Sequence, residues 1–248
     1  MIIDAHAHLG YDVVFDFEQS EQQLLDTYNR NKVDGAIIQP FICRPYIEDT
    51  VDIHNRISQF CKEYSGRFWG MASIQPHFRP KDYEKEAERC IKNLGFVGIK
   101  IATSAHGVCP SSRDGFHVYE VAKMLNVPVM IHTGSGTPFA DPISSWKVIE
   151  AFPEVKTIIA HAGSGLMMQQ AILMARKFDN VYLDTSWMPA PFIFDILKAI
   201  GAGKMMFASD YAINVKVEIT KYKMVVRKKS DYEKVMGGTA RGVFNLKI

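Results

Sequence analysis

Short apolar runs alternate with longer amphipathic stretches along the whole chain. Eight runs, rich in β-branched residues and as long as buried strands, occur at residues 1–8, 35–41, 68–75, 96–103, 127–133, 155–162, 181–186 and 205–210. Helical spacing fills the gaps, most clearly at 18–31, 82–94, 115–125, 144–151, 166–178 and 191–200. Eight strands, each followed by a helix, predict an α/β fold of the (β/α)8 TIM-barrel type. The alternative is an open doubly wound sheet, but the glycine-rich phosphate turn that normally follows its first strand is missing here.

We expect one domain over residues 1–248, because no linker rich in Pro, Gly or Ser interrupts the alternation. A short repeat supports successive equivalent units. His-Thr-Gly-Ser-Gly, starting at His132, recurs as His-Ala-Gly-Ser-Gly, starting at His161. The spacing matches one strand, loop and helix, so the two histidines are predicted to occupy the same place in neighbouring units.

Composition narrows the class of protein. Of the 248 residues, 47% are hydrophobic and 23% charged, which is typical of a soluble globular chain and excludes a disordered or fibrous one. A net charge of +2 gives no reason to expect a nucleic-acid partner, and no apolar run approaches the roughly 18 residues needed to cross a membrane. The N-terminus lacks a signal-peptide pattern, and the four cysteines form no CxxC pair. We therefore expect a reduced, cytoplasmic protein.

The first predicted strand carries potential metal ligands. His6 and His8 are two residues apart, so strand alternation places both imidazoles on one face, with Asp4 one step deeper. By the same alternation, Ala5 and Ala7 face the helix layer. In a barrel the shared face is the lumen, and this run ends at its mouth.

Later predicted strands end in further polar residues. His132, His161 and Asp210 close strands five, six and eight, and Lys100 lies late in strand four. In a barrel these residues converge on the C-terminal face, where such folds keep their active sites. Imidazoles with a carboxylate suit Zn²⁺ or a neighbouring divalent transition ion. None of the four cysteines belongs to this set of residues, which favours an open catalytic site over a structural one. Each histidine alone could equally be a hydrogen-bonded core residue, but the joint pattern favours a metal site.

Five segments, spread over essentially the whole chain, carry a resemblance: IDAHAH at 3–8, GFVGIK at 95–100, VMIHTG at 129–134, IAHAG at 159–163 and FASDY at 207–211. With these segments the sequence resembles the amidohydrolase superfamily, in the branch that contains aminocarboxymuconate-semialdehyde decarboxylase and many metal-dependent hydrolases of unknown substrate. Two positions depart from the branch's pattern, Thr239 where Asn is usual and Ala212 where Pro is frequent. Neither position is an expected ligand.

The resemblance implies a divalent metal centre. The positions that match the family's primary metal ligands are His6, His8, His132 and Asp210. His161 matches a histidine that polarises the substrate or acts as an acid–base group in one-metal members, and that binds the second ion in two-metal members. Asp210 also matches the general base that takes a proton from metal-bound water.

Lys100 separates two versions of the site. In two-metal members a strand-four lysine is carboxylated and bridges the ions, whereas an unmodified ammonium would repel a second cation and could hold a substrate carboxylate. We expect one Zn²⁺, or another divalent ion such as Mn²⁺, with His161 and Lys100 left to act on the substrate. One alternative is a second ion, bound by His161 and a carboxylated Lys100. Another is a purely structural role for Lys100, in an ion pair with Asp4.

Three functions fit this pattern. The leading hypothesis is hydrolysis of an amide, ester or lactone by a metal-activated water at the barrel mouth. The first alternative is non-oxidative decarboxylation of an unsaturated or aromatic acid. Decarboxylases of the branch tend to be longer, with inserted loops and carboxylate-gripping arginines, so the short loops here favour hydrolysis. The second alternative is a metal- or ligand-binding barrel without catalysis. The expected partner is a small molecule such as a carboxylate, and similar barrels are commonly homodimers.

Loop residues on the same face are secondary candidates. Those for binding an anionic substrate are Arg44, Tyr46, His77, His106 and Arg113, and those for lining the pocket are Asp184 and Trp187. The glycine turns at 134–136 and 163–165 could cradle a phosphate on backbone N–H groups, or let the backbone pass close to a metal site. For each of these an ordinary loop role is the competing interpretation. His54, in a helical pattern, is assigned no function.

Overall fold

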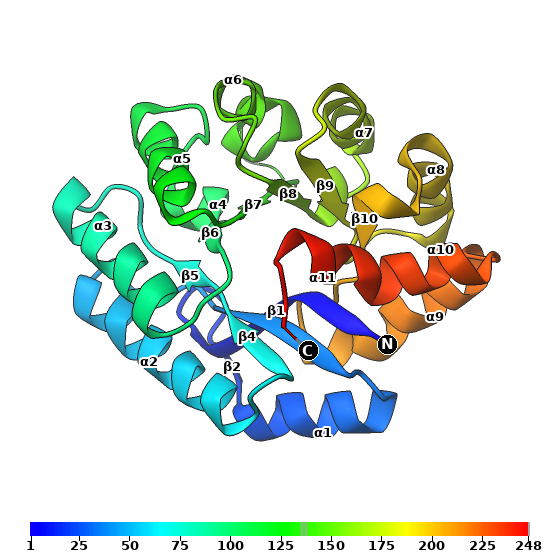
Figure 1. The fold of residues 1–248 in the computed structure, drawn as a ribbon, viewed down its shortest axis with the longest axis horizontal. Coiled ribbons are helices and arrows are strands. Elements are labelled where there is room, and N and C mark those ends of the chain that lie inside the picture. The colour runs from blue at the N-terminus through cyan, green and yellow to red at the C-terminus, as the bar shows by residue number, and fades with distance from the viewer. Residues whose placement is uncertain (135, 137, 248) are drawn as a thin grey trace.

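The computed structural model, which describes residues 1–134, 136 and 138–247, is a ring of parallel strands surrounded by helices (Figure 1). All eight predicted strands are present, the third of them in two consecutive parts, β4 and β5. The strands of the ring are β1 (Ile3–Asp12), β3 (Gly35–Pro40), β4 (Phe68–Gly70), β5 (Ala72–Ser73), β6 (Ile99–Ile101), β7 (Val129–His132), β8 (Thr157–Ala160), β9 (Val181–Asp184) and β10 (Met205–Met206).

Backbone hydrogen bonds close the ring at two seams. At one, the Met71 N–H, between β4 and β5, donates to the Ile38 carbonyl of β3 at 2.8 Å. At the other, the Asp210 N–H, beyond β10, donates to the His6 carbonyl of β1 at 2.8 Å, and Ala7 pairs with Asp210 in a parallel bridge. The predicted (β/α)8 barrel is therefore confirmed over an open sheet. The second seam also brings the histidines of strand one beside Asp210.

Most helices follow the strands on the outside of the ring, whereas the last one contributes Ala240 and Val243 to the cluster inside the barrel (Figure 1). α1 (Glu21–Asn31) begins with a capping box, in which the Ser20 hydroxyl accepts from the Gln23 N–H and the Gln23 side chain accepts from the Ser20 N–H. The other helices are α2 (Ile47–Glu63), α3 (Pro80–Glu88), α4 (Thr103–His106), α5 (Arg113–Leu125), α6 (Trp146–Ala151), α7 (Met168–Lys177), α8 (Ala190–Ile200), α9 (Val215–Val225), α10 (Lys229–Glu233) and α11 (Thr239–Val243).

Two elements differ from the sequence pattern. β1 continues to Asp12 and turns into an antiparallel strand, β2 (Phe17–Gln19), so α1 begins at Glu21 instead of residue 18. The pattern delimits no helix at 47–63, where α2 forms. The buried face of α2 includes the polar residues Thr50, His54 and Ser58, which weaken its apolar periodicity.

A β-bulge in β1 changes which residues face the lumen. The register with β3 shifts after Asp4, so Ala5 packs in the barrel interior while the Asp4 carboxylate points outward and accepts from the Tyr28 hydroxyl of α1 at 3.1 Å. The predictions that Asp4 shares the face of His6 and His8, and that Ala5 faces the helices, are therefore wrong. The extra residue of a bulge lets two successive side chains, Ala5 and His6, lie on the same side.

Apolar side chains pack in two layers. A small inner cluster fills the barrel and includes Ile37, Met71, Met130, Ile158 and Met206, and a larger cluster lies between the strands and the helices. The inner layer forms an apolar base beneath the polar residues at the strand ends. Among the described residues, no helix combines the length and the apolar character that crossing a bilayer requires.

Candidate metal centre

Three acceptor atoms meet at the C-terminal end of the barrel. His6 Nε2 lies 3.1 Å from His8 Nε2, and Asp210 Oδ1 lies 3.2 Å from each of them. Two ligand atoms that are each about 2.0–2.2 Å from one ion, at tetrahedral or octahedral angles, lie about 3–3.5 Å apart. The triangle formed by these atoms therefore has the size of one face of a metal coordination shell.

The remaining nitrogen of each histidine is already paired. His6 Nδ1 lies 2.7 Å from Asp184 Oδ2 at the end of β9, and His8 Nδ1 lies 2.7 Å from the Pro40 carbonyl at the end of β3. A carboxylate and a carbonyl only accept, so both Nδ1 atoms carry hydrogens, and each ring in its neutral form presents a lone pair at Nε2. Two such lone pairs and a carboxylate oxygen, facing one another with no hydrogen between them, fit a bound cation.

Asp210 is held in a strained position. Its Oδ2 accepts a hydrogen bond from Trp187 Nε1 at 2.8 Å, which leaves Oδ1 facing the two histidines. Asp210 and Trp187 have φ angles of 68° and 65°, in the left-handed region that residues with a Cβ rarely adopt. Backbone strain of this kind clusters at functional sites.

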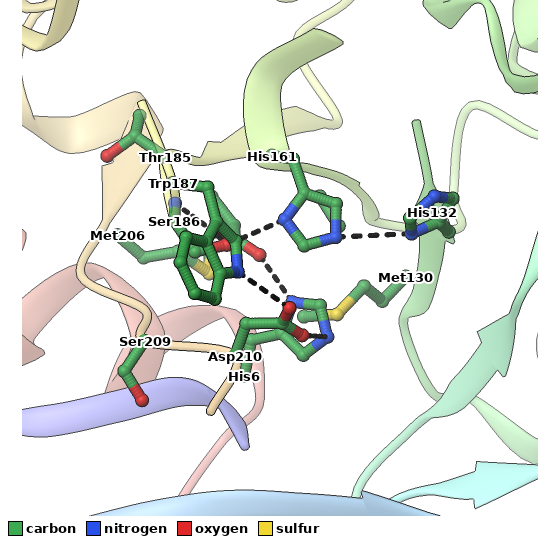
Figure 2. Close-up of polar contacts among 12 residues, drawn as sticks. His6, Met130, His132, His161, Thr185, Ser186, Trp187, Met206, Ser209 and Asp210 are labelled. Carbon is green, nitrogen blue, oxygen red and sulfur yellow. Dashed lines mark hydrogen bonds and ion pairs between the residues drawn. The ribbon is translucent and has the colours of Figure 1, made fainter. Parts of the chain in front are cut away.

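His161 and His132 form a second pair beside the triangle (Figure 2). His161 Nδ1 lies 2.8 Å from Ser186 Oγ, and His161 Nε2 lies 3.1 Å from His132 Nδ1. Burial lowers the pKa of His161 below its ordinary 6.5, so the ring is neutral near pH 7. Among the described residues, the groups of donor atoms close enough to share an ion include His6, His8 and Asp210, but none includes His132. His132 therefore stays a predicted ligand whose nearest partner in this structure is His161.

Lys100 contributes a buried positive charge to the same place. Its Nζ lies 3.2 Å from His6 Nε2, and burial lowers the pKa of its ammonium to about 8, against the opposing charges of Asp210 and Asp184. No ion pair with Asp4 forms, because that carboxylate faces outward. Lys100 therefore lies beside His6 and not beside Asp4, and its role in the site stays a prediction.

An aromatic wall lies beside His8. Phe41 stacks on the His8 ring at 4.7 Å, Tyr211 stacks on Phe41 at 5.3 Å, and Trp187 meets Tyr211 edge-on at 5.8 Å. Trp187 remains 47% exposed, so its ring is open to a small molecule at the mouth. Sequence reasoning overlooks Phe41 and Tyr211 in this role, although Phe41 ends one predicted strand and Tyr211 directly follows another.

The secondary candidates divide into two groups. Asp184 and Trp187 reach the site, where they hold His6 and Asp210. His77 and Arg113 instead line a separate cavity of about 800 Å³ between α3 and α5, and His77 Nδ1 lies 2.6 Å from Asp114 Oδ2 there. These two residues therefore line this cavity and not the metal centre, where an anionic substrate is expected to bind.

The remaining loop candidates have ordinary local roles in this structure. Arg44 and Tyr46 are exposed before α2, and His106 Nδ1 accepts from the Ala102 N–H at 3.3 Å. In the turn at 163–165, the Gly163 N–H is already donated to Thr133 Oγ1 at 3.0 Å, so it is not free to bind a phosphate. The turn at 134–136 lies partly outside the described residues.

A family model described as Amidohydrolase matches residues 3–246. The chain belongs to the amidohydrolase family. The resemblance inferred from the five sequence segments is thereby confirmed, and with it membership of a family of enzymes.

Two relatives share sequence with this amidohydrolase. A 2-keto-4-carboxy-3-hexenedioate hydratase from Sphingobium sp. is 28% identical over 158 residues, which cover 50% of this chain and 46% of the hydratase, less than half of that protein. A gamma-resorcylate decarboxylase from Polaromonas sp. is 22% identical over 236 residues, which cover 73% of this chain and 71% of the decarboxylase.

Solved structures show the same fold. A 2,6-dihydroxybenzoate decarboxylase from Rhizobium superposes with a TM-score of 0.79 and 15% identity, over 99% of this chain and 98% of that one. A dihydroxybenzoic acid decarboxylase from Polaromonas sp., solved with bound manganese, gives 0.78 and 17%, over 99% of this chain and 97% of that one.

The prediction of hydrolysis is wrong, and these relatives support the decarboxylation alternative. The prediction relied on loop length, with the expectation that a decarboxylase carries long insertions. This chain nevertheless overlaps nearly all of a solved decarboxylase, so its short loops do not separate the two reactions. Histidines and a carboxylate around an ion serve either reaction, which is why residue types alone did not decide between them.

Proposed function

We propose that the chain is a divalent-metal-dependent enzyme that removes CO₂, without oxidation, from a small aromatic or unsaturated carboxylic acid. The observation that carries the metal dependence is the triangle of unprotonated acceptors on His6, His8 and Asp210. The decarboxylase relative supports the reaction, and the manganese in a decarboxylase of the same fold supports a divalent ion such as Mn²⁺ or Zn²⁺.

His6, His8 and Asp210 would hold the ion, with His132 as the predicted fourth ligand. When bound, the ion supplies a Lewis acid that draws electron density from substrate oxygens. Lys100, whose Nζ lies 3.2 Å from His6 Nε2, adds a positive charge that attracts the substrate carboxylate into the barrel mouth. Trp187 keeps the second oxygen of Asp210 occupied, so that carboxylate stays oriented towards the histidines.

Decarboxylation breaks one carbon–carbon bond, releases CO₂ and leaves the electron pair on a carbon that must then take up a proton. His161 would carry this proton, because its ring lies beside the triangle and the lone pair on its Nε2, 3.1 Å from His132 Nδ1, can take a proton up. The apolar wall of Phe41 and Tyr211 solvates a carboxylate poorly and uncharged CO₂ well. These apolar surroundings therefore favour conversion of the substrate carboxylate into CO₂.

Charge at the mouth favours an acid with one carboxylate. Among the described residues placed at this site, Lys100 is the one buried cation, and Arg44 is an exposed loop residue. A planar ring fits beside Tyr211 and the half-exposed indole of Trp187, since aromatic faces stack on one another. We therefore favour an aromatic monocarboxylic acid over an acyclic acid with several carboxylates.

Hydration of an unsaturated keto acid is the second candidate function, because the relative with 28% identity is a hydratase. It would use the same ion and the same proton-carrying groups, with water added across a double bond in place of CO₂ loss. The two functions therefore differ in their product and not in the residues required.

Product analysis tests the proposal directly. The Mn²⁺-loaded chain would be incubated with 2,6-dihydroxybenzoate, 5-carboxyvanillate and an unsaturated keto diacid, with released CO₂ measured enzymatically and products measured by mass spectrometry. We expect an aromatic acid to lose the mass of CO₂, and chelation to abolish the reaction until Mn²⁺ is restored. Gain of the mass of water by the keto diacid, with no CO₂ from any acid, would replace decarboxylation by hydration.

A further inference from the structure

Asp184 uses both carboxylate oxygens inside the protein. It is fully buried at the end of β9, and its Oδ2 lies 2.7 Å from His6 Nδ1. Its Oδ1 accepts from the backbone N–H and from the hydroxyl of Ser186, both at 2.7 Å. Because an ionised carboxylate only accepts, the Ser186 hydroxyl has to spend its single hydrogen on Asp184.

The direction of this bond fixes the next ones. Ser186 Oγ also lies 2.8 Å from His161 Nδ1, and an oxygen whose hydrogen is already donated accepts there, so His161 Nδ1 carries a hydrogen. In the neutral ring, Nε2 then holds a lone pair. That atom lies 3.1 Å from His132 Nδ1, which is the donor when no ion lies between the two nitrogens. The chain of hydrogen bonds runs one way, from His132 through His161 and Ser186 to Asp184. Figure 2 shows His132, His161 and Ser186 in this order.

We infer that Asp184 sets the tautomer of three histidines of the site, His6 directly and His161 and His132 through Ser186. All three are held with the hydrogen on Nδ1. His8 reaches the same tautomer separately, because its Nδ1 donates to the Pro40 carbonyl. Asp184 and Ser186 are thus positioning residues, which act on the site through the histidines.

Contacts on the opposite side of the rings agree with this assignment. Lys100 Nζ lies 3.2 Å from His6 Nε2, and the Gln39 amide nitrogen lies 3.4 Å from His8 Nε2. An ammonium and an amide NH₂ group are donors, so the Nε2 atoms they face are acceptors. In neutral His132, a hydrogen on Nδ1 likewise leaves the lone pair on Nε2. The inference follows from the hydrogen-bond geometry and goes beyond the proposed reaction.

Nitrogen-15 NMR of the histidine rings tests the inference. Long-range ¹H–¹⁵N spectra of the full chain, recorded with Zn²⁺ and again after chelation, report which ring nitrogen carries the hydrogen. We expect the Nδ1–H form for His6, His8, His132 and His161, assigned through single His→Gln variants. In Ser186→Ala, the signals of His161 and His132 should shift towards a mixture of tautomers, while those of His6 and His8 stay unchanged.

Ser58→Ala is the matched control, because Ser58 is a buried serine on α2 whose hydroxyl has no hydrogen-bond partner in the described part of the chain. It should leave all four histidine signals in place. An Nε2–H form of His161 or His132 in the unmodified chain would overturn the inference, and this reading needs no variant to fold. So would a folded Ser186→Ala chain with unchanged His161 and His132 signals.

A second measurement connects the tautomers to the ion. Mn²⁺ affinity, followed by the EPR signal of free Mn²⁺, should fall about tenfold in Ser186→Ala, as is usual when a partner of a ligand-orienting residue is removed. Ser186→Thr, which keeps a hydroxyl, should restore most of the affinity. This arm rests on the proposed metal site and the NMR arm does not, so failure of one is distinguishable from failure of the other. Unchanged affinity alongside shifted tautomers would overturn the link to the ion.

Discussion

Among the described residues, two clusters of histidine and acidic residues can be compared, and they are built in opposite ways. One is the triangle at the barrel mouth. The other lies in the helix layer, where His54 of α2 meets Glu86 of α3 and Cys90 of the following π-helical turn (Arg89–Asn93). His54 Nδ1 lies 2.7 Å from Glu86 Oε1, and His54 Nε2 accepts from the Ser73 N–H at 3.0 Å. Both ring nitrogens are therefore used by the protein itself.

The rest of the helix-layer cluster is equally complete. Arg89 grips Glu86 with two parallel hydrogen bonds of 2.7 and 2.8 Å, and the Cys90 thiol lies 3.4 Å from Glu86 Oε1. At the mouth, by contrast, His6 Nε2 and His8 Nε2 face each other and Asp210 Oδ1, all three of them acceptor atoms, while Lys100 Nζ and the Gln39 amide approach the two nitrogens from the other side. The same residue types thus make either a structural cross-link or a metal centre, depending on whether lone pairs are left facing one another.

Replacing Asp210 should have the largest effect on metal binding and turnover. Asp210→Asn takes away the negative charge of the triangle, so we expect bound metal to be lost and turnover to fall about 10³-fold or more. Elemental analysis and steady-state kinetics measure the two effects. The matched variant in the other cluster, Glu86→Gln, should keep its metal and most of its activity. A metal-replete Asp210→Asn chain would contradict the assignment of the triangle.

Lowering the pH should show how much the helix-layer cluster contributes to the stability of the folded chain. Burial works to raise the pKa of Glu86, but hydrogen bonds from His54 and Arg89 prevail and lower it from 4.5 to about 2. A depressed carboxyl pKa stabilises the folded chain above pH 4.5, and that contribution is lost as the pH falls from about 4.5 towards 2. The shift corresponds to roughly 3 kcal/mol.

Urea unfolding of the unmodified chain and of Glu86→Gln, followed between pH 3 and pH 7, measures this difference. The variant should be less stable at pH 7, and the gap should narrow as the pH falls. Parallel curves for the two chains would show that Glu86 is not what ties stability to pH in this range.

Trp187→Phe should have the smallest effect. The change keeps an aromatic ring at the mouth and removes the hydrogen bond to Asp210 Oδ2, so the carboxylate gains freedom and Mn²⁺ affinity falls about tenfold. Trp146→Phe is the control, since Trp146 packs edge-on against Phe178 in the helix layer. Equal Mn²⁺ affinities for the two variants would mean that the indole hydrogen bond does not orient Asp210.

The sequence predicts the strands and the convergence of His6, His8, His161, Lys100 and Asp210 well, because period-two alternation and strand ends are local signals. The bulge after Asp4 is not local: it shows only in the pairing of β1 with β3. The polar buried face of α2 likewise hides that helix from a hydrophobic pattern.

The contacts that complete the site lie far apart along the chain. Asp184 reaches His6 across 178 positions, and Trp187 reaches Asp210 across 23. Nothing in the spacing of single residues indicates which carboxylate will hold which ring. The reaction was harder still to predict, because hydrolysis, hydration and decarboxylation draw on the same kinds of side chain.

The bulge in β1 gives the strand two independent registers. The inward-facing residues before it, Ile3 and Ala5, belong to the packed base of the barrel, and those after it, His6 and His8, belong to the mouth. Because side chains alternate with a period of two, deleting the extra residue would turn both histidines towards the helices, whereas substitutions of similar size at Ile3 or Ala5 would leave them in place. The apolar residues of the base can therefore be substituted without moving the histidines of the mouth. Equally, the residues of the mouth can be changed while the base stays the same. For an engineer grafting a new site onto this barrel, the number of residues in β1 matters more than their identity.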